Sequence, residues 1–373
     1  MLRIQGAIDG GDPRRGNAGG RSALREKLQG QAFRWGVVGT GAIARQFAAD
    51  LKYLPGAGVA AVCSRSAESA EAFRKRTGAA KAYTLLDDML ADQEVDAVYV
   101  ATPNIWHAQQ AIAALDAGKA ALVEKPLATT VGEAESMAAS ATKSGALLME
   151  GLWTRFLPAV TAVRTMLAQR AIGDIVRVKG ELAYFHAENP AIRFFDPMLG
   201  GGAALDLGVY LLSLAVDLFG APERVEGRWK AARTGVDCRM DFHLSFSNGS
   251  DAALSCGFDR DGDNAFTIFG TKGAIRLNPP FLKAQQVTLF SAPLRGFAGA
   301  GGLTGKALAR LPFPGKTAKN HPFPGGGLQF EAEAFARSVR QGARQNGVMP
   351  LEDSIAVLKI IEAIKALPPE NSR

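Results

Sequence analysis

The chain has 373 residues, of which 47% are hydrophobic and 42 are glycines. This length and composition allow two domains with full hydrophobic cores, and they exclude a disordered or fibrous protein. The net charge of +7 is concentrated in two segments: residues 1–34 hold +4 and residues 295–327 hold +5, which leaves −2 for the rest. Neither basic segment carries a nucleic-acid-binding motif, so we expect no nucleic-acid partner.

The positions of the cysteines and the hydropathy argue against a disulfide-rich, a metal-binding and a membrane-spanning protein. Cys63, Cys238 and Cys256 are scattered without the spacing of a disulfide framework or a zinc site, so we expect reduced thiols and no metal. No run approaches the ~18 apolar residues of a membrane span, and we expect no membrane partner. Residues 1–32 are polar and rich in Gly and Arg, which predicts a flexible basic arm rather than a leader peptide. We therefore expect a cytoplasmic protein.

The first ordered element is expected to be a buried strand at residues 33–38, followed at once by a glycine loop and a helix to about residue 54. This order is the fingerprint of a dinucleotide-binding fold. The first glycine permits the tight turn, the second lets the backbone approach the pyrophosphate, and the helix N–H groups bind it. We expect cofactor contacts from the residues of this loop, namely Gly39, Thr40, Gly41, Ala42 and Ile43.

The segment after the second expected strand, residues 58–63, predicts which dinucleotide is bound. Ser64-Arg65-Ser66 stands where an NAD-specific fold has an acidic residue for the ribose 2′-hydroxyl. An arginine favours the 2′-phosphate of NADP instead, because a guanidinium pairs with phosphate in a fork and stacks on adenine. We therefore expect NADP(H), bound by Ser64 and Arg65; a solvated loop arginine is the alternative.

Strand and helix patterns alternate up to about residue 150, with helices at 67–77, 104–117 and 131–144 and strands at 95–101, 121–123 and 146–149. This rhythm is typical of a doubly wound parallel sheet. Later strands are longer and alternate in polarity, at 176–185, 224–232, 238–246, 251–258, 266–269 and 274–277. Asn248-Gly249 predicts a type I′ hairpin between two of them.

The expected fold is therefore α/β, with two domains after the arm. A Rossmann NADP-binding domain spans residues 33–150, and a C-terminal α/β domain with a large open, mostly antiparallel sheet spans residues 151–373. Residues 294–327 are rich in Gly, Pro and basic side chains and form an unusually long connection. A mobile lid, an oligomer arm and disorder remain open for this segment; a basic lid would favour anionic substrates.

Five motifs occur in the order of a known family. After the glycine loop come Ala101-Thr102-Pro103-Asn104 with His107, then Glu124-Lys125-Pro126, then the run GGGAALDLGVY at 200–210, and last GLQFEAE at 327–333. From residue 33 to about 367 the chain thus resembles the Gfo/Idh/MocA family of nicotinamide-dependent oxidoreductases. The resemblance implies further cofactor contacts from Thr102, Pro103, Asn104, His107, Glu124, Lys125 and Pro126.

The same resemblance implies that Lys125, Asp206 and Tyr210 are catalytic. Lys125 follows a parallel strand, where doubly wound folds bind ligands, and in the family the next peptide bond is cis. Partial desolvation beside a charged nicotinamide is expected to make its ammonium easier to deprotonate. Asp206 and Tyr210 are four residues apart and face the same way on a helix. We expect Tyr210 as general acid/base, Lys125 steering its pKa and Asp206 positioning a hydroxyl; a structural Tyr–Asp hydrogen bond is the alternative.

Two details resemble particular branches of the family. Tyrosine at position 210, where much of the family has histidine, is similar to the glucose–fructose oxidoreductase and dihydrodiol dehydrogenase branches. The stretch MEGLWTRFLP at 149–158 is similar to the latter. This implies that Trp153, Arg155 and Phe156 lie at the cleft mouth and bind substrate with Asp206 and Tyr210. For Trp153 and Phe156, packing in the core is the alternative.

These expectations combine into an NADP(H)-dependent dehydrogenase or reductase acting on the CH–OH group of a sugar, polyol or cyclic diol, with the dihydrodiol type as a variant. The rival is a catalytically idle NADP(H)-binding sensor or assembly protein of the same fold; the three catalytic residues argue against it. Residues 252–258 place small or apolar side chains on both faces of a strand. We therefore expect a homodimer, or an assembly built from one, formed sheet to sheet.

Overall fold

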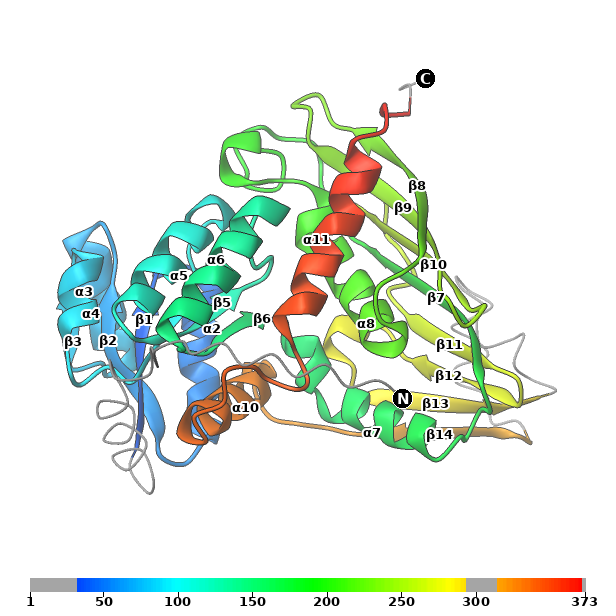
Figure 1. Cartoon of the computed structure of the whole chain (residues 1–373), viewed down its shortest axis with the longest axis horizontal. Coiled ribbons are helices and arrows are strands. Elements are labelled where there is room, and N and C mark those ends of the chain that lie inside the picture. The colour runs from blue at the N-terminus through cyan, green and yellow to red at the C-terminus, as the bar shows by residue number, and fades with distance from the viewer. Residues whose placement is uncertain (1–31, 293–313, 371–373) are drawn as a thin grey trace, which may run out of the picture.

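The computed structural model describes residues 32–292 and 314–370, which form two sheets with helices around and between them (Figure 1). Residues 1–31 and 293–313 lie outside the described part of the chain. The expected N-terminal arm and the first part of the long Gly/Pro-rich loop therefore lie outside it as well.

The first sheet has six parallel strands in the order β3-β2-β1-β4-β5-β6. The order reverses between β1 and β4, which is the switch point where doubly wound folds bind ligands. This confirms the expected Rossmann architecture. The strands are β1 Phe33–Val38, β2 Ala57–Cys63, β3 Lys81–Tyr83, β4 Ala97–Val100, β5 Ala120–Glu124 and β6 Leu148–Gly151. The helices are α2 Ala42–Asp50, η2 Leu51–Tyr53, α3 Ala67–Thr77, α4 Leu86–Ala91, η3 Asn104–Trp106, α5 His107–Asp116 and α6 Val131–Ser144.

Capping residues explain where the helices of this half begin and end. Ser66 accepts a hydrogen bond from Ser69 N at the start of α3, and Thr130 accepts one from Glu133 N at the start of α6. Each of these helices ends at a glycine in the left-handed conformation, Gly78 for α3 and Gly145 for α6. The short elements β3 and α4 were not expected, because their apolar patterns span too few residues to show a period.

The second sheet has eight strands in the order β14-β13-β12-β11-β7-β10-β9-β8, antiparallel except for the β7–β10 pair. Helices α7, α8 and α11 lie between it and the first sheet (Figure 1), which confirms the expected C-terminal architecture. Its strands are β7 Ile175–Ala183, β8 Arg224–Ala231, β9 Asp237–Ser245, β10 Asp251–Gly257, β11 Phe266–Gly270, β12 Gly273–Leu277, β13 Gln286–Ser291 and β14 Lys316–Asn320. The helices of this half are η4 Trp153–Phe156, α7 Pro158–Ala168, η5 Pro197–Leu199, η6 Ala204–Gly208, α8 Val209–Phe219, η7 Phe281–Lys283, α10 Leu328–Arg340 and α11 Leu351–Lys365.

The apolar segment that ends in α8 is a core helix. Among the described residues, Pro197–Phe219 has the length and hydropathy of a membrane span, but 83% of its most apolar 18-residue stretch is buried inside the protein. Its apolar side chains face the second sheet on one side and the neighbouring helices on the other. Because α8 is buried all round, the tyrosine in its first turn is held rigidly.

The turn between β9 and β10 differs from the expected type I′ hairpin. A type I′ turn needs a left-handed conformation at both central residues, but of this pair only Gly249 has it, with φ 78°. The side chain of Asn248 instead accepts a hydrogen bond of 3.0 Å from Ser250 N. Asn248 therefore stabilises a longer turn through its side chain.

The end of the long loop is ordered. Residues Lys316–Asn320 form β14, which pairs with β13 at the edge of the second sheet. The expectation of one irregular connection over 294–327 is therefore wrong for this part. The strand forms despite its polar sequence because the open sheet edge satisfies its backbone groups.

Helix α10 returns to the Rossmann domain. The ring of Phe335 lies 5.2 Å from that of Trp35 in β1. At the start of the helix, the buried carboxylate of Asp50 in α2 accepts hydrogen bonds from Gly326 N at 2.7 Å and Leu328 N at 3.0 Å. The end of the chain thus fastens the two halves together.

The outward face of the second sheet is charged. The inward residues of β10 are apolar, as expected, but ion pairs between Arg177 and Asp251 (2.9 Å) and between Arg228 and Asp241 (2.9 Å) cover the other face. Within residues 252–258 the outward side chains, such as Ala253 and Ser255, are small as expected, but the face that they share with the neighbouring strands carries these charges. Arg177, Arg228 and Asp241 come from β7, β8 and β9, so the sequence of β10 alone does not reveal them.

Candidate active site

The glycine loop between β1 and α2 has the geometry of an anion-binding turn. Gly39 has φ 103°, and a Cβ there would lie 2.6 Å from Ala101 O, so only glycine fits. A Cβ on Gly41 would meet no atom within 4 Å, which leaves room at the start of α2. The first turn of α2 holds no acidic residue and no capping side chain, so its N–H groups suit a pyrophosphate. The residues present fit a dinucleotide.

Arg65 stands just beyond the carboxyl end of β2, where the ribose of such a dinucleotide would lie. Its side chain is exposed and forms no ion pair or hydrogen bond with the described residues. Ser64 N donates to Tyr83 O at 3.1 Å, which ties the segment to β3. The guanidinium of Arg65 is therefore held near the site without being committed to a protein partner.

Lys125, Asp206 and Tyr210 meet at the carboxyl end of β5. Lys125 Nζ donates to the main-chain oxygen of Asp206 at 2.7 Å and to its Oδ1 at 2.9 Å. The same nitrogen lies 5.1 Å from the centre of the Tyr210 ring. Asp206 belongs to the π-helical turn η6 and Tyr210 to the first turn of α8. The peptide bond from Lys125 to Pro126 is cis, as the resemblance implied.

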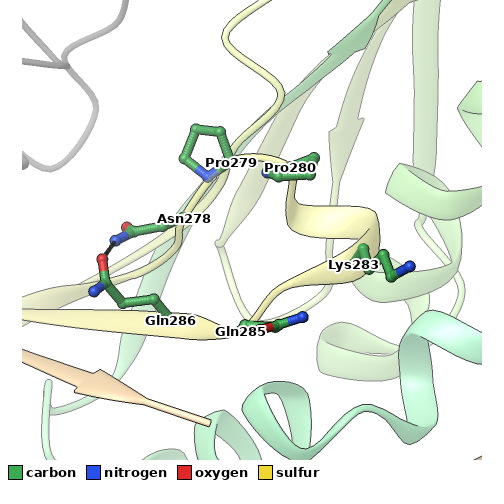
Figure 2. A pocket seen from close by; sticks show the side chains of 6 residues that line it. All are labelled: Asn278, Pro279, Pro280, Lys283, Gln285 and Gln286. Carbon is green, nitrogen blue, oxygen red and sulfur yellow. Dashed lines mark hydrogen bonds between the residues drawn. The ribbon is translucent and has the colours of Figure 1, made fainter. Parts of the chain in front are cut away.

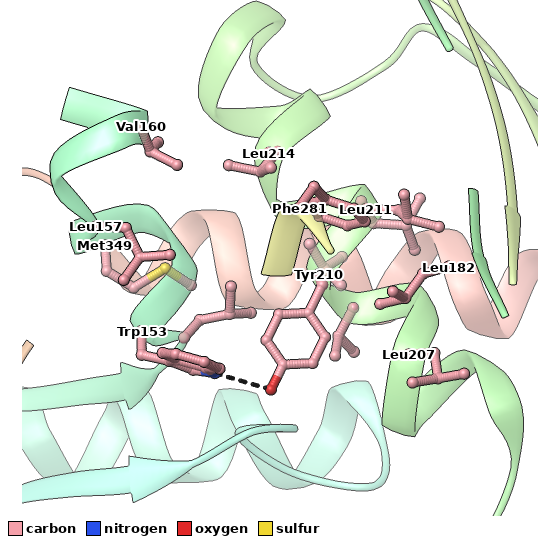
Figure 3. Close-up of a cluster of buried hydrophobic side chains, with 14 of the residues drawn as sticks. Trp153, Leu157, Val160, Leu182, Leu207, Tyr210, Leu211, Leu214, Phe281 and Met349 are labelled. Atoms are coloured by element: carbon pink, nitrogen blue, oxygen red, sulfur yellow. Dashed lines mark hydrogen bonds between the residues drawn. The ribbon is translucent and has the colours of Figure 1, made fainter. Parts of the chain in front are cut away.

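Trp153 contacts this group directly. Its Nε1 donates to the hydroxyl of Tyr210 at 3.0 Å, at the edge of a buried hydrophobic cluster that includes Leu207, Leu211 and Phe281 (Figure 3). The tyrosine hydroxyl accepts this bond and so keeps its own proton available for another acceptor. Both rings are largely buried, at 8% and 7% exposure. Trp153 therefore orients the tyrosine.

Lys125 and Tyr210 both hold their protons near neutral pH. Burial lowers the pKa of Lys125, but the Asp206 carboxylate and Tyr210 raise it more, so the net shift is upward. The groups of the chain alone thus raise the pKa of Lys125, and the easier deprotonation expected beside a charged nicotinamide stays a prediction. Burial raises the pKa of Tyr210 to about 12, against the opposing effect of Lys125. Lys125 and Tyr210 therefore both carry a proton that they can donate.

A set of buried acidic and phenolic groups lies behind Lys125. The hydroxyl of Tyr99 donates to Glu124 Oε1, and Lys125 N donates to Glu124 Oε2 at 3.2 Å. Burial raises the pKa of Glu124 to about 7. Glu331 of α10 is completely buried and neither of its oxygens has a hydrogen-bond partner among the described residues. Burial and the nearby Glu124 and Glu150 raise the pKa of Glu331 well above its ordinary value.

Two family models match this chain. One, described as an oxidoreductase family with an NAD-binding Rossmann fold, covers residues 33–152, and the other, described as a GFO/IDH/MocA C-terminal domain, covers residues 160–276. The trans-1,2-dihydrobenzene-1,2-diol dehydrogenase of Bos taurus is 30% identical over 343 residues, which span 90% of this chain and 96% of that protein. The chain belongs to the Gfo/Idh/MocA family of oxidoreductases.

Further relatives and solved structures are similar over nearly the whole chain. The trans-1,2-dihydrobenzene-1,2-diol dehydrogenase of Mus musculus is 31% identical over 337 residues, or 89% of this chain and 95% of that protein. Among solved structures, the 3-ketoreductase KijD10 from Actinomadura kijaniata, in complex with NADP and TDP-benzene, has a TM-score of 0.74 and 27% identity, covering 90% of this chain and 98% of that one. The aldose-aldose oxidoreductase of Caulobacter crescentus, at 22% identity and a TM-score of 0.77 over 90% of this chain and 96% of that one, shares the fold.

Within the family motifs, several residues shape the site rather than line it. His107 is completely buried, with one ring nitrogen 2.8 Å from Pro126 O and the other 2.9 Å from Thr102 O. Glu124 and Pro126 are buried as well. These residues hold the Lys125 turn against the loop after β4, and the expectation that His107, Glu124 and Pro126 touch the cofactor stays a prediction. Asn104 remains part-exposed and donates to Gly200 O at 3.0 Å.

Arg155 does not reach the cleft mouth, so the expectation that it binds substrate is wrong. Its side chain is completely buried, and its guanidinium donates to Ser213 Oγ at 2.7 Å, Val348 O at 3.0 Å and Asp353 Oδ2 at 2.6 Å. Arg155 thus joins η4 to α8, to α11 and to the segment before α11. Phe156 is partly buried and packs against the main core, as the alternative for it stated.

Two residues near the site were missed by sequence reasoning. Arg193 Nη2 lies 3.1 Å from Asp206 Oδ1, the oxygen that also binds Lys125. Asp237, with 1% exposure, accepts a hydrogen bond of 2.6 Å from Ala204 N at the start of η6 and pairs with Lys365 of α11 at 3.0 Å. Neither residue stands in a recognisable motif, and each meets the site only through the fold.

A separate hollow lies at the turn between β12 and β13. Its volume is about 360 Å³, and it is lined by Asn278, Pro279, Pro280, Lys283, Gln285 and Gln286 (Figure 2). The amide of Asn278 is bonded to Gln286 and Thr288. None of the residues of the candidate active site lines this hollow.

Proposed function

We propose that the chain is an NADP(H)-dependent oxidoreductase that transfers a hydride between the nicotinamide and a CH–OH carbon of a sugar, polyol or cyclic diol. The observation that carries the proposal is the convergence of Lys125, Asp206 and Tyr210 at the carboxyl end of β5. This is the edge of the sheet at which the glycine loop also opens. The names of the relatives support the reaction class, since they include a dihydrodiol dehydrogenase and a 3-ketoreductase.

We assign separate roles to the residues around the reacting carbon. Hydride exchange is the chemistry that a nicotinamide supplies when bound. Tyr210 keeps its proton, because burial raises its pKa to about 12, and its hydroxyl is oriented by Trp153. It donates to the substrate oxygen when a carbonyl is reduced and takes the proton back in the reverse reaction. Lys125, held by Asp206, places a positive charge beside the same oxygen and stabilises negative charge that develops there.

The cofactor choice rests on Arg65. Its exposed and uncommitted guanidinium stands after β2 without an acidic neighbour in the Ser64-Arg65-Ser66 segment. A 2′-phosphate would gain a charge-assisted pair there, whereas a free 2′-hydroxyl would not. This supports NADP(H) over NAD(H).

A substrate panel tests the proposal. The purified protein is incubated with NADP⁺ or NADPH and with aldoses, inositols and cyclic diols or their keto forms, and the nicotinamide absorbance is followed. We expect turnover with at least one of these classes. NADPH binding without turnover on any of them, in either direction, would instead indicate the idle NADP(H)-binding sensor or assembly protein.

A further inference from the structure

Arg193 is a half-exposed cation at the catalytic group. Its side chain is 55% exposed, and its Nη2 shares Asp206 Oδ1 with Lys125, at 3.1 Å against 2.9 Å. Asp206 is the carboxylate that pairs with both cations. Two positive charges thus share one carboxylate oxygen, so Asp206 alone does not neutralise both cations.

The guanidinium of Arg193 lies on an aromatic ring, which restricts its orientation. It lies 4.4 Å from the centre of the Phe194 ring, and that ring stacks on His186 with centroids 4.8 Å apart. A guanidinium laid on an aromatic face keeps a fixed plane. Nε and Nη1 make no hydrogen bond with the described residues, so part of this oriented fork is available to a ligand.

The glycines before η6 allow the backbone of the Arg193 segment to pack closely against the start of the helix that carries Asp206. A Cβ on Gly201 would lie 2.8 Å from Arg193 O and 2.7 Å from Phe194 O, and Gly202 N donates to Phe194 O at 3.0 Å. A larger residue at 201 would push the Arg193 segment away from the helix that carries Asp206. Phe195, which is almost fully buried, anchors the same segment in the core.

We propose that Arg193 binds an oxyanion on the substrate, a carboxylate or a phosphate carried by the polyol, and so selects sugar acids or sugar phosphates over neutral sugars. This inference rests on the proposed function. A planar fork with free donors is the group that recognises carboxylate and phosphate. Because Lys125 and Arg193 share one oxygen of Asp206, the oxyanion lies on the substrate close to the reacting hydroxyl.

The test compares charged and neutral substrates of one series. The kcat/KM values for gluconate, glucose 6-phosphate and glucose are measured for the unmutated protein and for Arg193→Ala, Arg193→Lys and Arg170→Ala. We expect the unmutated protein to prefer a charged member, and Arg193→Ala to lower the charged-to-neutral ratio by about 10–100-fold, the worth of one charged hydrogen-bonded pair. Arg193→Lys keeps the charge but loses the fork, so its ratio should be intermediate.

Arg170 is the matched control, because it is exposed and pairs with one aspartate, Asp174, away from the cleft; Arg170→Ala should leave the ratio unchanged. Whether gluconate or glucose 6-phosphate shows the larger effect identifies the oxyanion. Titration calorimetry with the same three ligands on the NADP⁺-loaded protein gives a readout without turnover. Loss of anion binding in Arg193→Ala without any turnover would uphold this inference and reject the proposed function. No charge preference in the unmutated protein, or equal losses on all three ligands, would overturn it.

Discussion

At the scale of single residues, the chemistry of the site depends on which side chains are protonated. Lys125 is kept as an ammonium by Asp206, and Tyr210 is kept as a phenol by burial. Behind them, Glu124 has a pKa raised to about 7, and Glu331 has no hydrogen-bond donor among the described residues. A buried carboxyl without donors is far more stable neutral than ionised. The interior behind the lysine therefore holds protons as well.

The first prediction concerns the proposed proton donors. Lys125→Met or Tyr210→Phe should lower turnover by about 10²–10⁴-fold, the usual effect of losing general acid–base catalysis, while the dissociation constant of NADPH changes little. Tyr83→Phe is the control, because it removes a phenol that is bonded to Asp92 away from the site. Steady-state kinetics and fluorescence titration measure both quantities. Turnover near that of the unmutated enzyme in both variants would remove these residues from the mechanism.

The second prediction concerns Arg65. The protein should bind NADPH more tightly than NADH, and Arg65→Ala should weaken NADPH binding by about 10–100-fold, since one charge-assisted phosphate pair is lost. NADH binding should stay within about threefold. Arg76→Ala, an exposed arginine on the following helix, serves as control. Equal dissociation constants for the two cofactors in the unmutated protein would contradict the assignment of NADP.

The third prediction is a pH dependence of stability from Glu331. Its pKa is raised in the folded protein, so above the ordinary glutamate pKa the folded chain keeps a proton that the unfolded chain has lost. Stability from this group is therefore complete at low pH and is lost as the pH rises toward the folded pKa. Glu331→Gln should flatten this loss, and the variant should gain at least about 1 kcal/mol over the unmutated protein between pH 5 and pH 8.

Urea unfolding at the two pH values measures this difference. Glu333→Gln on the same helix is the control, because Glu333 is exposed and its substitution should leave the pH dependence as it is. A parallel pH dependence in Glu331→Gln and the unmutated protein would mean that Glu331 is ionised in the fold.

At the scale of elements, the helix that starts with η6 and continues as α8 carries both Asp206 and Tyr210. Its first turn is anchored by the buried Asp237, which binds Ala204 N and pairs with Lys365 of α11. A negative charge at a helix N-terminus also interacts favourably with the free N–H groups there. Strand β9, helix α8 and helix α11 are therefore joined at one carboxylate close to the site.

The fourth prediction follows from this anchor. Asp237→Asn should lower the free energy of unfolding by about 1–3 kcal/mol, because it leaves Lys365 unpaired and weakens a charged hydrogen bond in the interior. Turnover should fall as Asp206 and Tyr210 lose their fixed position. The matched change Asp251→Asn breaks an ion pair on the outward face of the sheet, where the cost should be about 0–1 kcal/mol. Equal costs for the two variants, by urea unfolding, would show that Asp237 is no anchor.

At the scale of the whole molecule, the second sheet has one face covered by helices and one outward face (Figure 1). That outward face carries alternating charges, among them the Arg177–Asp251 and Arg228–Asp241 pairs. A surface with both signs is able to meet a copy of itself across a two-fold axis. The contact proposed here is therefore ionic in character, unlike the apolar one that the sequence of β10 suggested.

The fifth prediction is the homodimer itself. Sedimentation at micromolar concentration should show a dimer or a larger assembly built from dimers, and the dimer should weaken as salt is raised, because exposed charge pairs are screened. Double reversal of charge at Arg177 and Asp251 keeps that ion pair within one chain but changes its complementarity to the copy, and it should weaken the dimer. A single species of 39.3 kDa would mean that the prediction is wrong.

The sequence by itself determined the parts of this protein that depend on short-range pattern. The glycine loop, the alternating elements of the first sheet and the place of Lys125 after a strand are all local, because backbone conformation and burial period act over a few residues. The fold class and the family followed from these motifs in order. Asp206 and Tyr210 were found through the family resemblance of the run at 200–210, and their spacing added only that both face the same way on one helix.

Only the tertiary structure decided which polar side chains face the site and which face the core. Arg155 and Arg193 have the same chemistry, yet one is completely buried and the other is half exposed at the catalytic group. Asp237 and Glu331 reach their places from segments remote from the site in sequence. Their surroundings come from packing between distant elements, and that packing sets burial, partners and therefore charge. No local pattern of a single chain contains this information.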